Sequence, residues 1–186
     1  MPRSPRRFSS GRAYHLINRG VRRLPLFATD DDYVHFQQLM GAAQQRTPLR
    51  LLAYCLMPNH WHLVVWPEDP ASVSAYMRWL TWSHACHFNT THDLSGHVYQ
   101  GRYRSIVVGD ERHLLTLLRY VEGNPVRAGL VNRSETWRWS SLSSCPSIAL
   151  CESPVRRPSG WLDLLAGSDS HEAQEVPGTV KDHNWP

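Results

Sequence analysis

The amino-acid sequence predicts a single domain with an α+β fold. Three observations support this prediction: short apolar runs typical of strands, longer segments with apolar residues three and four positions apart, and the order in which these segments alternate. The chain has 186 residues, 41% of them hydrophobic and 19% charged, which is enough to bury a sizeable core. No apolar run reaches the roughly 18 residues that a membrane helix needs. The basic N-terminus lacks the apolar stretch of a secretory signal.

The first predicted elements are a strand, a helix and a hairpin. The strand covers residues 14–18, where apolar residues precede a glycine. The helix covers residues 30–47, in which apolar side chains follow three-four spacing until a proline ends the pattern. Apolar runs over residues 51–56 and 60–66, separated by a tight turn at 58–59, predict a hairpin.

The remaining elements complete a recognisable order. A second helix starts at Asp69, and a polar loop follows it over residues 89–98. A short strand covers residues 105–108. The last helix covers residues 110–124, because the residue before a proline avoids the helical region. The first six elements match the ferredoxin-like βαββαβ sandwich, and the seventh is an additional C-terminal helix.

The predicted domain spans residues 1–145, with residues 1–11 as a basic arm. Residues 146–186 are rich in Pro, Gly, Ser and acidic residues, with one short apolar patch over residues 161–165. Such a composition favours an acidic, flexible C-terminal tail.

Positive charge is segregated along the chain. Of 20 basic residues, 19 are Arg and one is Lys, and the net charge is +4. Residues 1–23 carry seven Arg and no acidic residue, and residues 100–157 carry nine Arg and five acidic residues. Basic blocks that meet on one face would attract a polyanion such as a nucleic acid. An unstructured basic arm with a solvated acidic tail would give the same distribution of charge, and a codon bias toward Arg would give the same ratio of Arg to Lys.

The four cysteines have neither zinc-site nor redox-motif spacing. They are Cys55, Cys86, Cys145 and Cys151. Without a secretory signal, the expectation is a cytoplasmic protein with reduced thiols. Cys55 falls in an apolar run and is expected in the core.

His60 and His62 are candidate metal ligands. They are one residue apart on a predicted strand, so both imidazoles lie on one face while Trp61 points into the core. Two imidazoles on one rigid face suit a divalent metal. In a chain with 11 His, however, packing alone accounts for such a pair equally well.

Tyr120 and Asn124 form a second candidate pair. They lie one helical turn apart and therefore share a face of the last predicted helix. Tyr120 stands at the margin of an apolar stripe, where a ring is half packed and its hydroxyl can reach a ligand. Spacing alone favours the alternative of an ordinary core-margin tyrosine and a helix stop before Pro125.

The segment around the two histidines, YCLMPNHWHLV, resembles the signature of the REP-associated tyrosine transposases. These proteins belong to the single-tyrosine HUH (His-hydrophobic-His) transposase superfamily. Further blocks resemble the family in its own order: YHLINRG over residues 14–20, GHVYQGRYRS over 96–105, RYVEGNPVRAGLV over 119–131, and a closing WRWSS over 137–141. Together the blocks cover residues 12–142.

The resemblance implies a metal-dependent single-stranded DNA endonuclease and strand transferase that acts on palindromic hairpins. It implies that Tyr120 is the nucleophile. It also implies that His60, His62 and Asn124 bind Mg²⁺ or Mn²⁺. A tyrosine hydroxyl, with an ordinary pKa of about 10, is protonated at neutral pH, and a divalent ion polarises the phosphate that it attacks. Attack by Tyr120 would leave a 5′-phosphotyrosine bond and a free 3′-hydroxyl. His15 is a candidate general base, although packing is its favoured role.

The residues expected to contact DNA come from four places. They are Arg3, Arg6, Arg7 and Arg12 in the arm, Asn18 and Arg19 at the end of the first strand, Arg102, Tyr103 and Arg104 in the central block, and Arg127 after the last helix. Arg suits phosphate contacts, and Tyr103 is a candidate ring for base stacking. A disordered arm and a solvated loop are the alternatives.

Two features depart from the family pattern. Residues 84–92 lack basic side chains, and Gly123 stands inside the predicted last helix, where Gly costs about 1 kcal/mol relative to Ala. Neither removes a proposed catalytic residue. The leading prediction is therefore an active DNA transposase that works away from membranes, as a monomer rather than a homodimer. The alternatives are a domesticated hairpin-DNA-binding protein with little or no turnover, and a metal-dependent hydrolase in which water attacks.

Overall fold

A computed structural model describes residues 7–166 of the chain. Arg3, Arg6 and residues 167–186 lie outside the described residues. The strands are β1 (Tyr14–Arg19), β2 (Leu51–Met57), β3 (His60–Val65) and β4 (Arg104–Val107). The longer helices are α1 (Asp30–Arg46), α2 (Pro70–Thr91) and α3 (Glu111–Glu122). Shorter helical segments are η1 (Val21–Arg23), α4 (Asn124–Arg127), η2 (Ser134–Thr136) and α5 (Trp161–Ala166).

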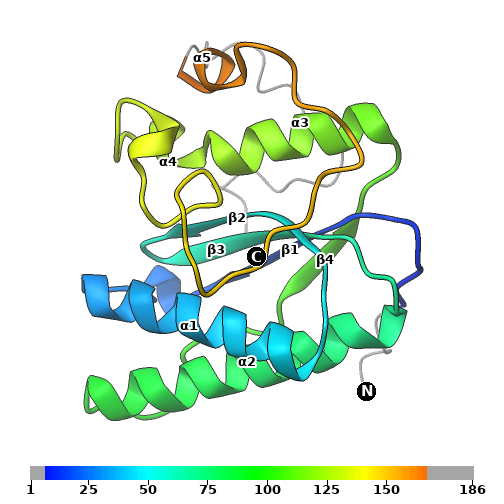
Figure 1. Ribbon diagram of the computed structural model, residues 1–186. Coiled ribbons are helices and arrows are strands. Elements are labelled where there is room, and N and C mark those ends of the chain that lie inside the picture. The colour runs from blue at the N-terminus through cyan, green and yellow to red at the C-terminus, as the bar shows by residue number, and fades with distance from the viewer. Residues whose placement is uncertain (1–6, 167–186) are drawn as a thin grey trace.

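The strands form one antiparallel sheet in the order β2-β3-β1-β4. This order places β1 and β3 side by side in the centre, as the ferredoxin-like pattern requires. Helices α1 and α2 cover one face of the sheet, and α3 covers the other, with α5 beyond it (Figure 1). The predicted α+β fold with an additional C-terminal helix is confirmed.

Strand alternation divides the buried side chains between two cores. On β3, Trp61 and Leu63 join the core under α1 and α2. Val64, on the opposite face, joins the core under α3 together with Leu117 and Leu118. Because successive strand residues point to opposite faces, His60 and His62 share the α3 face with Val64.

Each long helix begins at a polar residue that caps it. The Thr29 hydroxyl accepts from the Asp32 amide, and the Asp32 carboxylate accepts from the Thr29 amide, which completes a capping box at the start of α1. Asp69 caps α2, and Asp110 caps α3 through the His113 amide. These caps satisfy amides that have no partner inside the helix.

Three features differ from the prediction. Helix α2 continues to Thr91, into the segment predicted as a loop. Helix α3 ends at Glu122, so Gly123 follows the helix instead of interrupting it, and a separate turn, α4, begins at Asn124. The described part of the predicted flexible tail is packed, because Trp161 and Leu165 are buried against the α3 core. Burial of these two apolar side chains therefore fixes a segment that the composition had assigned to a flexible tail.

Candidate active site

The two candidate ligand histidines lie in the central strand β3. His62 is fully buried and His60 nearly so, and their ring centroids are 4.9 Å apart. In the β1–β3 ladder, His60 lies opposite Arg19 and His62 opposite Ile17. His60 and His62 therefore lie on one face of the sheet, as predicted, and the residues paired with them belong to the neighbouring strand β1.

His62 is the centre of a chain of polar contacts. Its Nδ1 lies 2.8 Å from Nε2 of His15, a β1 residue, and the two rings stack with centroids 5.0 Å apart. Its Nε2 lies 3.0 Å from the side-chain nitrogen of Asn124, the first residue of α4. The structure thus joins His62 to Asn124, which sequence reasoning had placed in a separate candidate pair.

Tyr120, near the end of α3, packs against the same histidine. The rings of Tyr120 and His62 meet edge to face, with centroids 5.6 Å apart. The Arg127 guanidinium lies over the Tyr120 ring, 4.6 Å from its centroid, and also donates to the Tyr120 carbonyl. A Cβ on Gly123 would lie 2.8 Å from Arg127 Nη1 and 2.9 Å from the Arg119 carbonyl. The missing side chain therefore leaves room for Arg127 to fold back over Tyr120.

His15 and His62 are held neutral. Burial lowers the pKa of His15 to about 3. Burial also lowers the pKa of His62 well below its ordinary value, and the positive charges of Arg127 and Arg19 act in the same direction. Desolvation disfavours the charged imidazolium. Neutral imidazoles have a lone pair available to bind a metal ion without first losing a proton.

The residues present fit a divalent cation. His62 Nε2 lies 3.0 Å from the side-chain nitrogen of Asn124, so the amide group of Asn124 stands beside the imidazole nitrogen that would bind a cation. An amide oxygen suits Mg²⁺ or Mn²⁺, whereas imidazole nitrogens suit Mn²⁺ better than Mg²⁺. In the described residues no group of three or more His, Cys, Asp or Glu could hold a metal ion.

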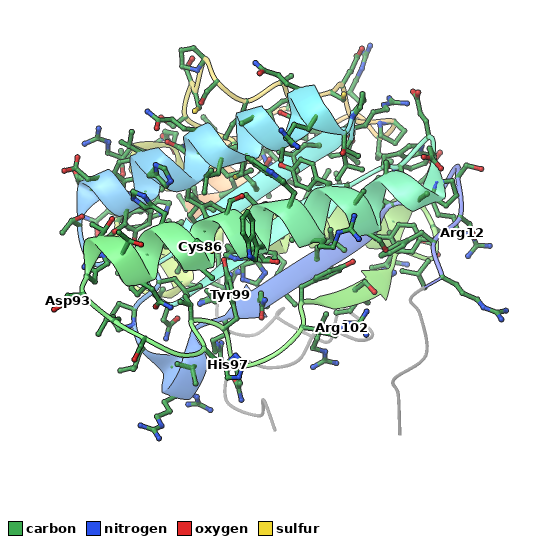
Figure 2. The ribbon with its side chains drawn as sticks, turned by 90° about the horizontal axis from the view of Figure 1, so that it is seen from below. Arg12, Cys86, Asp93, His97, Tyr99 and Arg102 are labelled. Carbon is green, nitrogen blue, oxygen red and sulfur yellow. The ribbon has the colours of Figure 1, made fainter. Side chains whose placement is uncertain are left out.

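Several predicted DNA-contact arginines surround this cluster. Arg19 and Arg127 are close enough to His62 to lower its pKa, and Arg104 of β4 does the same for His15. Arg7, Arg12 and Arg102 are exposed, and Arg12 and Arg102 lie at the rim of the molecule (Figure 2). The positive charge near the histidines therefore comes from parts of the chain that are far apart in sequence. Arg104 lies 85 residues after Arg19, and Arg127 lies farther along still.

Asn18 and Tyr103 are placed differently from the prediction. Asn18 is 2% exposed, and its side chain is used inside the protein, since Nδ2 donates to the Gly101 carbonyl and Oδ1 accepts from the Arg19 amide. Tyr103 is 8% exposed and belongs to the core under α1 and α2. Both side chains are therefore taken up by packing, and Tyr103 does not present an open ring for base stacking.

Sequence reasoning missed two polar residues beside the site. Asn59, in the hairpin turn, accepts a hydrogen bond from His60 Nδ1 through its Oδ1 at 2.7 Å. Glu122, at the end of α3, is buried and binds Arg157 at 2.5 Å and Trp161 Nε1 at 2.6 Å. A signal for Glu122 exists in the sequence: it stands four residues after Leu118 on the apolar face of the helix, where a carboxylate requires a partner.

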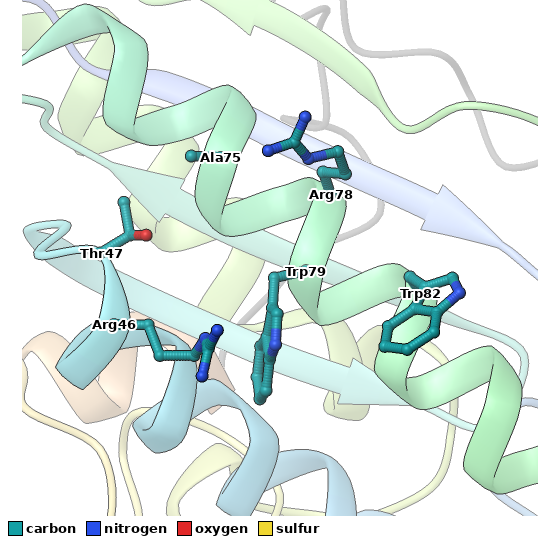
Figure 3. Close-up of a pocket in the computed structure, with 6 residues that line it drawn as sticks. All are labelled: Arg46, Thr47, Ala75, Arg78, Trp79 and Trp82. Carbon is teal, nitrogen blue, oxygen red and sulfur yellow. The ribbon is translucent and has the colours of Figure 1, made fainter.

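A cavity of about 670 Å³ lies away from the histidines, between α1 and α2. Figure 3 shows its lining: Arg46, Thr47, Ala75, Arg78, Trp79 and Trp82. It contains none of the predicted site residues. The candidate active site is thus the polar cluster between the sheet and α3, and it is distinct from this cavity.

Comparison with known proteins identifies the class to which this fold and site belong. The chain matches the family described as "Transposase IS200 like" over residues 9–124. None of the curated proteins matches it. A solved structure of a REP-associated tyrosine transposase bound to a REP hairpin is similar over 76% of this chain and 82% of its own, with 20% sequence identity and a TM-score of 0.61. A Deinococcus radiodurans R1 protein assigned as a transposase matches over 65% of this chain and 96% of its own, with 19% identity and a TM-score of 0.44.

The matched residues cover more than half of the chain, and they include β1, the two histidines and Tyr120. The chain therefore belongs to the IS200-like transposase family, as its motifs predicted. Its fold is that of the REP-associated tyrosine transposase. Among the residues that the structure describes, no helix is long and apolar enough to cross a membrane.

Proposed function

We propose that this chain cleaves and rejoins single-stranded DNA next to a hairpin, with Tyr120 as the nucleophile. One observation carries the proposal: the half-buried Tyr120 and the buried His62 and Asn124 come from three different elements and meet at one place. The similar structure with a hairpin bound supports hairpin DNA as the substrate class. The transposase family of the chain supports DNA processing as the reaction class.

His60, His62 and Asn124 would hold Mg²⁺ or Mn²⁺ in this proposal. The cation would supply positive charge to the scissile phosphate and to its transition state. Tyr120 would attack the phosphorus through its hydroxyl oxygen, so that the bond to the 3′ oxygen breaks and the DNA 5′ end is joined to the tyrosine. Attack by a DNA 3′-hydroxyl on this phosphotyrosine reverses the step and joins strands.

The protein's own residues would prepare this attack. Arg127 lies over the Tyr120 ring and would restrict its orientation relative to His62. Arg104, which is half-buried near His15, would meet a phosphate that enters from the β1–β4 side, whereas Arg19 is 5% exposed and would act through its positive charge from within the protein. Arg7, Arg12 and Arg102 are exposed and would contact more distant phosphates of the hairpin. Because Tyr120 packs against His62 of its own chain, we propose that the active species is a monomer.

An assay for the covalent adduct tests the proposal. The purified chain is incubated with Mn²⁺ and a hairpin oligonucleotide taken from repeats that flank its gene, and SDS-resistant protein–DNA adducts are counted on a gel. Tyr120→Phe should form no adduct, because phenylalanine has no hydroxyl oxygen that could bond to the phosphorus. His60→Ala should reduce it strongly, and omission of the metal should do the same.

Tyr99→Phe is the matched control, because Tyr99 is also half-buried but lies near the other face of the sheet, where it contacts His84 and Trp61. This variant should form the adduct at the wild-type rate. Cleavage by Tyr120→Phe at the wild-type rate would identify water or another residue as the nucleophile. A wild-type protein that binds the hairpin and never cleaves it would identify a binding protein instead.

A further inference from the structure

Each of the two proposed ligand histidines has a polar partner on the ring nitrogen nearer its backbone. His60 Nδ1 lies 2.7 Å from Asn59 Oδ1, and His62 Nδ1 lies 2.8 Å from His15 Nε2. In a neutral imidazole one nitrogen carries the proton and the other carries the lone pair that binds a metal. The partner on one nitrogen therefore decides which nitrogen is left for the cation.

The Asn59 amide has its orientation set by a second contact. Its Nδ2 donates to the Arg23 carbonyl at 3.2 Å, so its Oδ1 is the atom that faces His60. An amide oxygen only accepts hydrogen bonds. His60 Nδ1 must therefore carry the proton, and the lone pair of His60 is on Nε2.

The backbone that presents the Arg23 carbonyl is unusual. Arg22 and Arg23 have φ values of +54° and +63°, a left-handed conformation that residues with a side chain rarely adopt. A Cβ on Gly20 would lie 2.2 Å from the Leu24 carbonyl oxygen, so this turn closes only around a glycine. Rare backbone conformations persist where the surroundings impose them, often next to functional sites. Here the turn supplies the acceptor that orients Asn59.

His62 has the same proton arrangement through a different partner. The Asn124 amide nitrogen donates to His62 Nε2, which must then be unprotonated. The proton of His62 is on Nδ1, and it is donated to His15 Nε2. His15 is 2% exposed and comes from the neighbouring strand β1, so its ring is held in place by the sheet.

We propose that Asn59 and His15 are positioning residues, which hold both ligand histidines with the proton on Nδ1 and present Nε2 of each to the cation. The inference rests on the proposed metal site and goes beyond it, because neither residue is a ligand itself. Asn59 acts from the hairpin turn and His15 from an adjacent strand. The two contacts are independent, so each can be removed without the other.

The affinity for Mn²⁺ alone tests this role without any cleavage. Mn²⁺ is titrated into the full chain, with and without hairpin DNA, and the free ion is followed by electron paramagnetic resonance. His15→Leu and Asn59→Leu remove the acceptor, and each should raise the Kd for Mn²⁺ about 10- to 100-fold. Asn59→Asp keeps an acceptor oxygen and His15→Gln supplies one in place of the acceptor nitrogen, and each variant should stay within about threefold of the wild type or bind more tightly.

Matched controls separate positioning from general loss of structure. His84→Leu removes a buried histidine from the opposite face of the sheet, and Asn89→Leu removes an asparagine that donates to the Gly96 carbonyl. Both should keep the wild-type Kd for Mn²⁺. Wild-type Mn²⁺ affinity in His15→Leu and Asn59→Leu would overturn the inference and leave the metal site intact. Failure of the wild-type protein to bind Mn²⁺ even with hairpin DNA would overturn the proposed function as well.

The proton positions can also be observed directly. Long-range ¹H–¹⁵N spectra of the metal-free protein distinguish the two neutral forms of histidine. We expect His60 and His62 both to show a protonated Nδ1 and an unprotonated Nε2. A protonated Nε2 on either residue would overturn the inference for that residue, whatever its metal affinity.

Discussion

The two faces of the sheet each bury a histidine, and the two histidines have different surroundings. On the α1–α2 face, His84 is 1% exposed, its Nδ1 contacts the Tyr99 hydroxyl at 2.7 Å, and the Phe36 ring packs against it. On the α3 face, His62 is equally buried but contacts His15, Asn124 and Tyr120. Burial is therefore common to both, and only the chemistry of the neighbours distinguishes a core residue from a candidate ligand.

The comparison extends to the packing of each face. The α1–α2 face carries the larger apolar core, in which aromatic rings from several elements pack together. The α3 face replaces part of its core with polar groups beside the histidines, and a buried carboxylate lies at the end of α3. We therefore expect changes on the first face to lower stability most, and changes on the second face to lower activity most.

The largest expected effect on stability is at Trp61, which is fully buried on the α1–α2 face immediately before His62. Trp61→Ala should lower the free energy of unfolding by about 3–5 kcal/mol, because it leaves a large cavity. Urea denaturation measures this change. Trp82→Ala, at a residue that is 65% exposed, is the control and should stay within about 0.5 kcal/mol of the wild type. A loss at Trp61 no greater than at Trp82 would remove the distinction between the faces.

The next largest expected effect is on the pH dependence of the free energy of unfolding, to which His84 contributes. Burial lowers the pKa of His84 to about 3, so the folded state stays neutral where the unfolded state, with a pKa near 6.5, binds a proton. Stability is therefore present above pH 6.5 and is lost as the pH falls below it, by up to about 1.4 kcal/mol per pH unit. Between pH 6.5 and 4.5, the free energy of unfolding should therefore fall by about 2–3 kcal/mol less in His84→Gln than in the wild type.

Urea denaturation at several pH values measures this slope. The exposed His97 provides the control, since His97→Gln should leave the slope as in the wild type. An unchanged slope in His84→Gln would mean that its protonation does not contribute to acid unfolding.

A smaller loss of stability is expected at the buried carboxylate on the α3 face. Glu122 is paired with Arg157, whose side chain is 30% exposed. Arg157→Ala should cost about 2 kcal/mol, less than the 3–5 kcal/mol for a fully buried pair, because solvent already reaches the guanidinium. Arg138→Ala breaks the exposed pair with Asp30 and should cost no more than about 1 kcal/mol in the same urea titration. Equal losses at the two arginines would show that the C-terminal segment adds no more than a surface ion pair.

The smallest stability effect and a clear activity effect are expected at Arg127. Arg127→Ala removes an exposed cation from the Tyr120 ring and should cost under about 1 kcal/mol of stability. The rate of adduct formation should fall about tenfold or more, because the nucleophile is held less closely in its reactive orientation. Arg138→Ala removes a similar cation from the Trp139 ring, 4.4 Å from its centroid, and should leave the rate unchanged. Equal rates in the two variants would exclude a positioning role for Arg127.

Local patterns predicted most of the strands and helices, and they placed two of the candidate site residues on one face of the sheet. Alternation along β3 correctly placed His60 and His62 on one face, and three-four spacing correctly predicted the apolar stripe of α3. The same patterns misplaced Tyr103, because a loop position between charged residues does not reveal that the ring is covered by the core. They also placed residues 146–186 in a flexible tail, whereas Trp161 and Leu165 are buried against the α3 core, because a short apolar patch shows no partner until that core is assembled.

The sequence by itself determined the order of the elements, the two faces of each strand and the start of each helix, since these depend on residues within a few positions of one another. The family resemblance had already grouped His60, His62, Asn124 and Tyr120, and the tertiary structure decided how these candidate site residues contact one another and which further groups lie beside them. His15 reaches His62 across 47 residues, Asn124 reaches it across 62, and Arg157 reaches Glu122 across 35. Such contacts depend on the order of strands in the sheet and on the docking of α3, and no local spacing encodes either. The charge and shape of the candidate site are therefore a property of the assembled fold.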